Sequence, residues 1–247
     1  MLGENLRGVV EAWLADEVDE CDAGELRDLL DSDRAAAELA DRFSAPLSFG
    51  TAGLRGPLRA GPNGMNRAVV RRAAAGLAAW LTEHGRQGRP IVVGYDGRRR
   101  SAQFARDSAA VFAAAGFEAK LMPRLLPTPL LAFAVQRLGA AAGVMVTASH
   151  NPPQDNGYKV YLGDGAQIGP PVDREIEAAI RAVGRVRDVP LSDAFAVLDD
   201  SIVEDYVDAI AALVGAGPRE LTIVHTAMHG VGTEVVRKVF AATGFAA

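Results

Sequence analysis

Apolar side chains recur every three or four positions in residues 6–14 and again in residues 26–39. This spacing places them along one face of a helix, so each segment predicts an amphipathic helix. We expect these helices to form an N-terminal helical extension, residues 1–40, that packs on the part of the chain that follows.

Strands and helices alternate after this extension. The Gly-rich, apolar stretch 47–58 predicts a strand interrupted by a loop. Gly85 is a favourable stop for one helix and Ser101 a favourable N-cap for the next. The pattern predicts helices at 66–84, 101–116 and 129–138, and strands at 91–93, 117–122 and 143–146.

These strands are apolar throughout, which is typical of a sheet covered on both faces. We therefore predict an α/β fold, a layered α/β/α domain with a mostly parallel mixed sheet. Residues 158–162 do alternate, Gly163-Asp164-Gly165 supplies a turn, and residues 166–168 could return as a hairpin. Pro170-Pro171 then opens a helix. We assign this domain to residues 41–192.

A linker is expected to begin within residues 184–193. Beyond it the pattern predicts a helix at 202–214, a strand at 221–224 and a helix at 233–242. One strand and its helices cannot cover their own apolar faces. We therefore expect residues 200–247 to be the start of a second, similar domain, and the chain to be truncated. The alternative is that this unit docks onto the first domain.

Composition narrows the class of protein. Hydrophobic residues make up 49% and charged residues 23% of the chain, which argues against intrinsic disorder. A net charge of −5 argues against nucleic acid and anionic membranes as partners. No bilayer-spanning segment and no signal peptide is visible. Cys21 is the single cysteine and cannot form an internal disulfide, so we expect a soluble, cytoplasmic protein.

Residues 146–153, Val-Thr-Ala-Ser-His-Asn-Pro-Pro, directly follow a predicted buried strand. Loops at strand ends are where α/β proteins usually place their chemistry. Ser149 is expected on an exposed turn that Asn151-Pro152 makes sharp. A serine hydroxyl needs a base or an electrophilic partner to react. The alternative is that Ser149 and Asn151 only hydrogen-bond the turn backbone.

A serine hydrolase does not fit this loop. The Gly-x-Ser-x-Gly pattern is absent, because Thr147 and Asn151 occupy the glycine positions. His150 is adjacent to Ser149, and neighbouring side chains on an extended segment point apart. His150 could instead orient a substrate or shuttle a proton.

Three basic clusters suggest an anionic ligand. Residues 50–56 combine a Gly-rich backbone with Arg55, which suits phosphate oxygens. Residues 96–101, Asp-Gly-Arg-Arg-Arg-Ser, link a predicted strand to a helix. Lys159 lies on the alternating strand and could act as an acid or a charge clamp. The alternatives are a tight glycine loop with a solvated arginine, a basic turn, and a solvated lysine.

Three other patterns are weak evidence for a cofactor or metal site. Gly230-Val231-Gly232 precedes a helix, but Val235 stands where a dinucleotide-binding motif has its third glycine. His225 and His229 are four residues apart but lie at a strand end rather than on a helix face. The acidic residues of 31–34 fall within a helical pattern, where a solvated face is expected.

Four motifs follow one another along the chain: residues 49–56 (Phe-Gly-Thr-Ala-Gly-Leu-Arg-Gly), 94–98 (Gly-Tyr-Asp-Gly-Arg), 147–152 (Thr-Ala-Ser-His-Asn-Pro) and 156–159 (Asn-Gly-Tyr-Lys). Together they resemble the α-D-phosphohexomutase superfamily, the phosphoglucomutases and phosphomannomutases. The leading helices and residues 225–232 are more similar to the branch that contains phosphoglucomutase-2 and phosphopentomutase. The resemblance makes residues 40–190 the family's first domain.

The resemblance implies that Ser149 is a phosphoserine that hands its phosphoryl group to a sugar phosphate, forming a bisphosphate. A sugar 1,6-bisphosphate would act as activator by priming Ser149. The phosphate of Ser149 would be a Mg²⁺ ligand, Arg55 would steady its oxygens, and His150 and Lys159 would assist proton transfer. Substrate and phosphate contacts are expected from Thr51, Gly53, Arg55, Arg98, Asn151 and Lys159.

The sequence also departs from the family. The family's metal motif, Asp-x-Asp-x-Asp-Arg, and its third and fourth domains are missing. Because Mg²⁺ binding relies on carboxylates, we expect little mutase activity from this chain alone. Transfer between the 1- and 6-positions, or the 1- and 5-positions, of glucose, mannose or pentose phosphates stays open. The alternative is a non-catalytic phosphosugar- or anion-binding module, and uncovered apolar surface could promote self-association.

Overall fold

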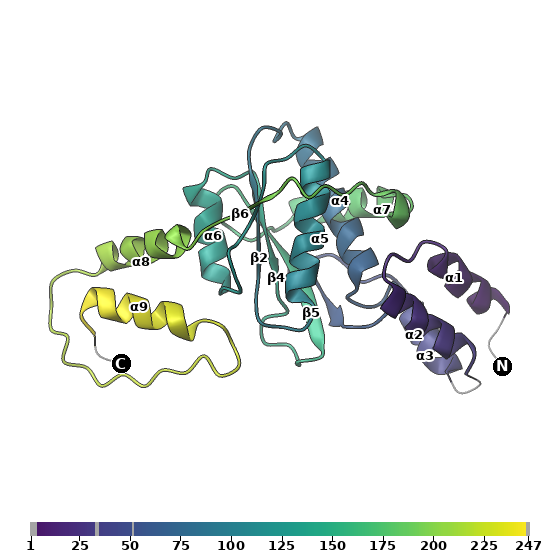
Figure 1. Ribbon diagram of the computed structural model, residues 1–247, viewed down its shortest axis with the longest axis horizontal. Helices are drawn as coiled ribbons and strands as arrows, with labels where there is room; N and C mark the ends of the chain where they lie inside the picture. The colour runs from purple at the N-terminus through teal and green to yellow at the C-terminus, as the bar shows by residue number, and fades with distance from the viewer. Residues whose placement is uncertain (1–3, 33–34, 51, 246–247) are drawn as a thin grey trace.

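The computed structural model describes residues 4–32, 35–50 and 52–245. Within these residues, six strands form one sheet in the order β1-β5-β4-β2-β3-β6 (Figure 1). The strands are β1 (Leu54–Pro57), β2 (Ile91–Tyr95), β3 (Ala119–Leu121), β4 (Ala142–Val146), β5 (Asp155–Leu162) and β6 (Ala196–Val197).

The described residues also form helices, only some of which pack on the sheet. They are α1 (Glu4–Leu14), α2 (Glu20–Leu30), α3 (Ala36–Arg42), α4 (Arg67–Glu83), α5 (Ser101–Ala114), α6 (Thr128–Arg137), α7 (Val172–Ala182), α8 (Ser201–Leu213) and α9 (Thr233–Thr243), with a short 3-10 helix at Val186–Asp188. None of these described helices combines the length and the apolar character that crossing a bilayer requires.

The sheet is mixed and mostly parallel, as predicted. Strands β4, β2, β3 and β6 run parallel; at the other edge β5 pairs antiparallel with β4, and β1 pairs antiparallel with β5. The pattern missed β6, because two residues at an edge are too short to show a period. The predicted return at residues 166–168 is present as a hydrogen bond from the Ile168 N–H to the Val160 carbonyl at 3.1 Å.

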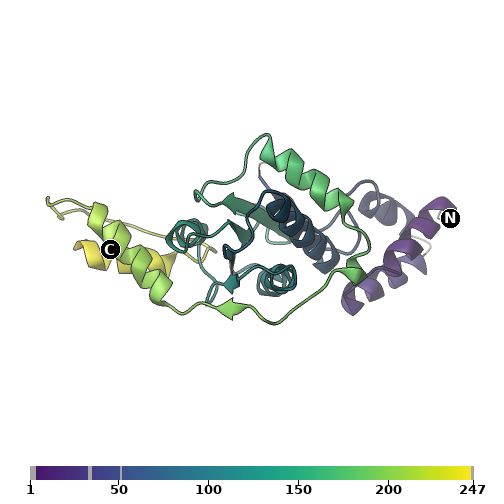
Figure 2. The same cartoon turned by 90° about the horizontal axis from the view of Figure 1, so that it is seen from above.

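Helices cover both faces of the sheet, which makes the three layers visible in Figures 1 and 2. Helices α4, α5 and α7 pack on one face, and α6 packs on the other with α8 against it. Alternate side chains of each strand enter the two cores. Val93, Val144 and Val160 belong to the first core, and Val92, Met145 and Tyr161 belong to the second.

Strand register decides which loops meet. Strands β2 and β4 are parallel neighbours that end together, with Tyr95 opposite Val146. The loops that follow them, residues 96–100 and 147–154, therefore leave the same edge of the sheet side by side. Strand β5 begins at this edge, with Gly157 opposite Arg55 of β1. Both loops contain motifs that the sequence predicts to be candidate functional sites.

The N-terminal extension differs from the prediction. Residues 26–39 do not form one helix, because α2 ends at Leu30 and α3 begins at Ala36. Asp31 and Ser32 compete for backbone hydrogen bonds and favour helix ends, which explains the break. The break lets Leu39 join Leu26 in a small separate core with Val10. The acidic cluster therefore follows a helix end; its residues 33 and 34 lie outside the described residues.

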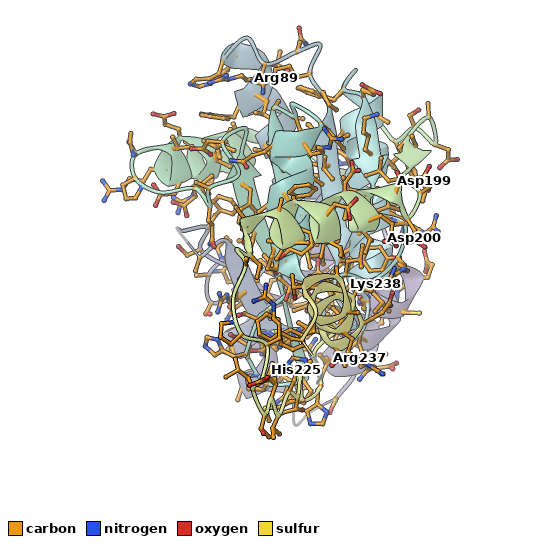
Figure 3. All side chains as sticks on the ribbon, turned by 90° about the vertical axis from the view of Figure 1, so that its left-hand side faces the viewer. Arg89, Asp199, Asp200, His225, Arg237 and Lys238 are labelled. Atoms are coloured by element: carbon orange, nitrogen blue, oxygen red, sulfur yellow. The ribbon has the colours of Figure 1, made fainter. Side chains whose placement is uncertain are left out.

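In residues 200–245 the structure confirms the two predicted helices but not the predicted strand. Residues 221–224 form no strand, and Val224 is 93% exposed. A strand needs a neighbour for its backbone hydrogen bonds, and no described segment pairs with this one. Helix α8 packs on α6 through the rings of Phe133 and Tyr206. Helix α9 packs on α8 (Figure 3). Assigning residues 200–247 to a second domain stays a prediction, as do the other domain limits.

Candidate active site at the carboxyl edge of the sheet

Ser149 lies exposed on a tight turn after β4. Its backbone is left-handed, with φ of 59°, a conformation that is uncommon for a residue with a side chain. The Ser149 N–H donates to the Thr147 hydroxyl at 2.9 Å, and the Asn151 N–H donates to the Ala148 carbonyl at 3.1 Å. Surrounding contacts therefore hold Ser149 in a strained conformation at the surface. The sequence predicted the exposed turn but not the strain.

Asp96, which follows β2, organises this turn. Its Oδ2 accepts a hydrogen bond of 2.6 Å from the Thr147 hydroxyl, and its Oδ1 accepts 2.9 Å from the Ser101 hydroxyl and 3.0 Å from the Arg98 N–H. Sequence reasoning did not single out Asp96 as a site residue. Its position directly after β2, at the edge where the serine loop begins, was the available signal. Asp96 therefore holds the serine loop to the segment that follows β2.

Ser101 is not the N-cap that was predicted. The N-cap of α5 is Arg100, whose φ is 63°, and Ser101 is the first helical residue. The Ser101 hydroxyl donates to Asp96 and accepts 3.0 Å from the Asn156 side-chain amide. A serine hydroxyl can serve tertiary partners instead of its own helix, which the local pattern does not reveal.

Arg98 contacts the serine loop from the neighbouring segment. Its guanidinium donates to four backbone carbonyls of the serine loop, at 2.8 Å to Ser149, Asn151 and Pro152 and at 3.0 Å to Asp155. Its Nε lies 3.5 Å from Asp96 Oδ2. Four of the five N–H groups of the guanidinium are thereby engaged in hydrogen bonds, and the fifth faces Asp96. Arg98 clamps the serine loop in this structure, and its contact with substrate stays a prediction.

Arg55 reaches the same loop from β1. Its Nη1 donates to Asn151 Oδ1 at 3.1 Å, and the Asn151 amide nitrogen donates to Asp155 Oδ2 at 3.0 Å. The Asn151 side chain is therefore occupied on both sides and orients Arg55. The Nε of Arg55 is buried and has no hydrogen-bond partner among the described residues. A buried donor without an acceptor is costly, so this guanidinium favours a further anionic ligand.

Lys159 lies beside Arg55. Opposite residues of antiparallel strands share a face, so Arg55, its partner Gly157 and then Lys159 lie on one face. Lys159 is only 9% exposed and makes no hydrogen bond or ion pair with any described residue. Burial and the nearby charge of Arg55 lower the pKa of Lys159, and Asp96 offsets this in part. Two adjacent cations without a bound carboxylate suit an anion.

Gly53 shapes the predicted phosphate loop by its lack of a side chain. Its φ is +74°, and a Cβ there would lie 1.9 Å from the carbonyl oxygen of Tyr158. Its N–H donates to the Gly50 carbonyl at 2.7 Å, and its contact with phosphate stays a prediction. Gly53 instead lets the turn lie against β5. Thr51, the other predicted contact in this loop, lies outside the described residues.

The structure shows no contact that bears on two further expectations, a role for His150 and a metal ion at Ser149. His150 is exposed next to Ser149 and makes no hydrogen bond within the described chain; its role stays a prediction. No group of three or more His, Cys, Asp or Glu side chains among the described residues is suited to a metal. The role of Ser149 as a metal ligand stays a prediction.

Comparison with known proteins identifies the family of this chain. Residues 46–186 match the family described as phosphoglucomutase/phosphomannomutase, alpha/beta/alpha domain I. A probable phosphomannomutase of Haemophilus influenzae is 50% identical over 73% of this chain and 38% of its own length. A phosphoribomutase of Saccharomyces cerevisiae is 37% identical over 80% of this chain and 35% of its own length.

A solved structure agrees with the sequence relatives. The crystal structure of a putative phosphomannomutase from Thermus thermophilus superposes with a TM-score of 0.61 at 37% identity, over 69% of this chain and 37% of that one. The chain thus spans less than two fifths of the length of these relatives. Since the family match covers more than half of its 247 residues, this chain belongs to the phosphoglucomutase/phosphomannomutase family of the α-D-phosphohexomutase superfamily.

Proposed function

We propose that this chain is the phosphoryl-carrying part of a phosphosugar mutase and that Ser149 carries the phosphoryl group. The observation that supports this most is an exposed, conformationally fixed Ser149 on the loop whose Asn151 holds the half-buried Arg55, with the buried Lys159 beside Arg55. Phosphoryl transfer depends mainly on positioning and on neutralising charge at the phosphoryl oxygens. These residues supply both requirements.

The proposed reaction has two halves. In the first, the bond between phosphorus and Ser149 Oγ breaks as a sugar hydroxyl forms its own bond to that phosphorus, giving a bisphosphate. The sugar hydroxyl loses its proton and Ser149 Oγ gains one. In the second half, the other phosphoryl group of the bisphosphate passes to Ser149 Oγ by the same exchange. An unphosphorylated Ser149 has nothing to donate, so a sugar bisphosphate must prime it.

The chain's own residues have separate roles in this scheme. Arg55, oriented by Asn151, neutralises the phosphoryl oxygens. Burial and Arg55 lower the pKa of Lys159, so it gives up a proton more readily than an ordinary lysine. Asp96, Thr147 and Arg98 hold the loop. His150 is a second candidate for moving the proton of Ser149.

Mg²⁺ is part of this proposal only through the family resemblance. The ion would supply positive charge beside the phosphate of Ser149, and the described residues do not provide its carboxylate ligands. The relatives are named as mutases of mannose, glucose and pentose, so the proposed substrate class is sugar phosphates, without a choice of sugar. Low turnover by this chain alone remains our prediction.

Priming tests the proposal directly. The chain is incubated with glucose 1,6-bisphosphate and Mg²⁺, and phosphoryl incorporation is followed by intact mass and peptide mapping. We expect one phosphoryl group on Ser149, none in Ser149→Ala, and wild-type incorporation in the control Ser192→Ala. Binding of the bisphosphate without transfer would support the non-catalytic binding module instead. Phosphorylation at another residue, or no binding at all, would overturn both hypotheses.

A further inference from the structure

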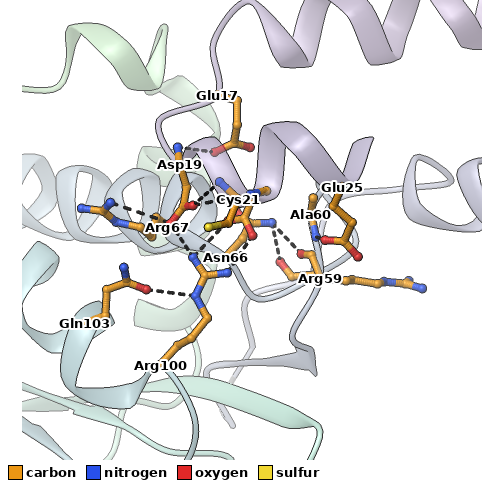
Figure 4. A network of polar contacts seen from close by, with 12 residues as sticks. Glu17, Asp19, Cys21, Glu25, Arg59, Ala60, Asn66, Arg67, Arg100 and Gln103 are labelled. Atoms are coloured by element: carbon orange, nitrogen blue, oxygen red, sulfur yellow. Dashed lines mark hydrogen bonds and ion pairs between the residues drawn. The ribbon is translucent and has the colours of Figure 1, made fainter. Parts of the chain in front are cut away.

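Arg100 joins the active-site edge to the N-terminal helices. Its guanidinium donates to Asp22 Oδ1 and to Asp19 Oδ2, both at 2.7 Å, and its Nε donates to Gln103 at 2.9 Å (Figure 4). It also lies over the ring of Phe104, 5.2 Å from the centroid. The Arg100 side chain is thus held between acidic residues at the start of α2 and a glutamine in the first turn of α5.

The acidic partners of Arg100 are themselves buried. Asp19 is 8% exposed and Asp22 is 4% exposed. Asp19 also caps α2, because its Oδ1 accepts 2.9 Å from the Cys21 N–H. Removing one member of a buried ion pair leaves an uncompensated charge, so such pairs resist rearrangement. The start of α2 therefore fixes the position of Arg100.

The residues that flank Arg100 in sequence contact the serine loop and β5 rather than the N-terminal helices. The Arg98 guanidinium holds four carbonyls of the serine loop, and the Arg99 carbonyl accepts 2.8 Å from the Asn156 side-chain amide. Ser101 bonds Asp96, which in turn holds Thr147. The left-handed backbone of Arg100, with φ of 63°, turns its side chain toward the N-terminal helices while its neighbours contact the active-site loop.

We propose that Arg100 is a positioning residue, through which the N-terminal helices hold segment 96–101 and, with it, the loop that carries Ser149. This inference rests on the proposed function, because its effect on transfer requires Ser149 to accept a phosphoryl group. Arg100 touches neither substrate nor the reacting atoms in this scheme. It acts through Arg98 and Ser101.

Another buried arginine of the extension provides a matched control. Arg42 is 5% exposed and pairs with Glu25 and Glu38, and it donates to the Ala60 carbonyl at 3.2 Å. None of these partners belongs to segment 96–101 or to the serine loop. Arg42→Gln therefore weakens the same extension without reaching the active-site edge directly.

The test compares Arg100→Gln, Asp22→Asn and Arg42→Gln in the full chain. Priming of Ser149 by glucose 1,6-bisphosphate is measured at several concentrations, with thermal unfolding alongside. We expect Arg100→Gln and Asp22→Asn to lower the saturating rate about tenfold with little change in the half-saturating concentration. Arg100→Lys should recover part of the rate. Arg42→Gln should lower the melting temperature and leave the rate of the folded protein unchanged.

Amide hydrogen exchange keeps the two proposals separable. In Arg100→Gln we expect faster exchange of the Ser149 and Asn151 amides, whose hydrogen bonds hold the turn, whether or not priming occurs. If the wild-type chain is not primed but this exchange changes, the proposed function fails and the positioning role of Arg100 stands. Unchanged exchange and rate in folded Arg100→Gln, or equal effects of Arg42→Gln, would overturn the positioning role. If Arg100→Gln does not fold, Asp22→Asn decides, because it keeps a hydrogen-bond acceptor.

Discussion

The hydroxyl of Thr147 donates to Asp96 Oδ2 at 2.6 Å and accepts from the N–H of Ser149 at 2.9 Å. Thr147 follows β4 and Asp96 follows β2, and these strands are parallel neighbours. One hydroxyl therefore links the reactive loop to the adjacent strand of the sheet. The strained backbone of Ser149 is maintained by contacts of this kind.

Replacing Thr147 by valine tests this link. Thr147→Val keeps the shape of the side chain but leaves Asp96 and the Ser149 N–H without this partner. We expect a loss of about 1–3 kcal/mol in the free energy of unfolding, since buried polar groups lose their hydrogen bonds. Urea denaturation measures it. Thr147→Ser keeps the hydroxyl and should stay close to the wild type; a valine variant as stable as the wild type would exclude the link.

Gly53 allows backbone strain to be separated from steric contact. Gly53→Ala places a Cβ 1.9 Å from the Tyr158 carbonyl oxygen, at φ of +74°. Gly88 has a similar φ of +80° but open space around its Cα. We expect Gly88→Ala to cost about 1 kcal/mol from conformation alone. Gly53→Ala should cost clearly more in the same denaturation experiment, and equal costs would show that the turn can move away from β5.

Arg98 and Arg99 distinguish a loop clamp from a phosphate ligand. Arg98→Lys cannot make the four carbonyl contacts of a guanidinium, so we expect about 1–3 kcal/mol lower stability and faster amide exchange in residues 149–151. Arg99→Lys, at an exposed neighbour, should change neither. Isothermal titration with glucose 1,6-bisphosphate completes the test. If Arg98→Lys weakened binding while stability and exchange stayed unchanged, Arg98 would be a ligand after all.

Lys159 makes stability depend on pH in a definite direction. Burial and Arg55 lower its pKa in the folded chain, whereas the unfolded chain keeps the ordinary value of 10.5. Between the lowered pKa and 10.5, the unfolded state binds more protons, so stability rises with pH across that interval. Lys159→Met should remove this rise. Chemical denaturation at a series of alkaline pH values measures it, and an unchanged slope in the variant would assign the effect elsewhere.

Local patterns predicted the elements that carry their own signal. The helix predicted at 66–84 is α4, and the apolar run after it is β2, because burial on both faces leaves a recognisable sequence. The exposed turn at Ser149 followed from Asn151-Pro152 and its place after a buried strand. The prediction of a strand at 221–224 was wrong because β structure depends on a partner strand that local sequence does not specify.

The roles of the charged residues could not be predicted in the same way. Arg55, Arg98 and Arg100 look alike in sequence, yet one lies beside Lys159, one clamps the serine loop and one pairs with α2. Only the register of β1 with β5 and of β2 with β4 decides which side chains meet.

The sequence by itself determined the α/β class, most helices and the serine loop, because these follow from local periodicity and turn chemistry. The tertiary structure decided the partners of each arginine, the burial of Lys159 and the support of Thr147 by Asp96. These depend on contacts between segments far apart in the chain, which no local pattern encodes.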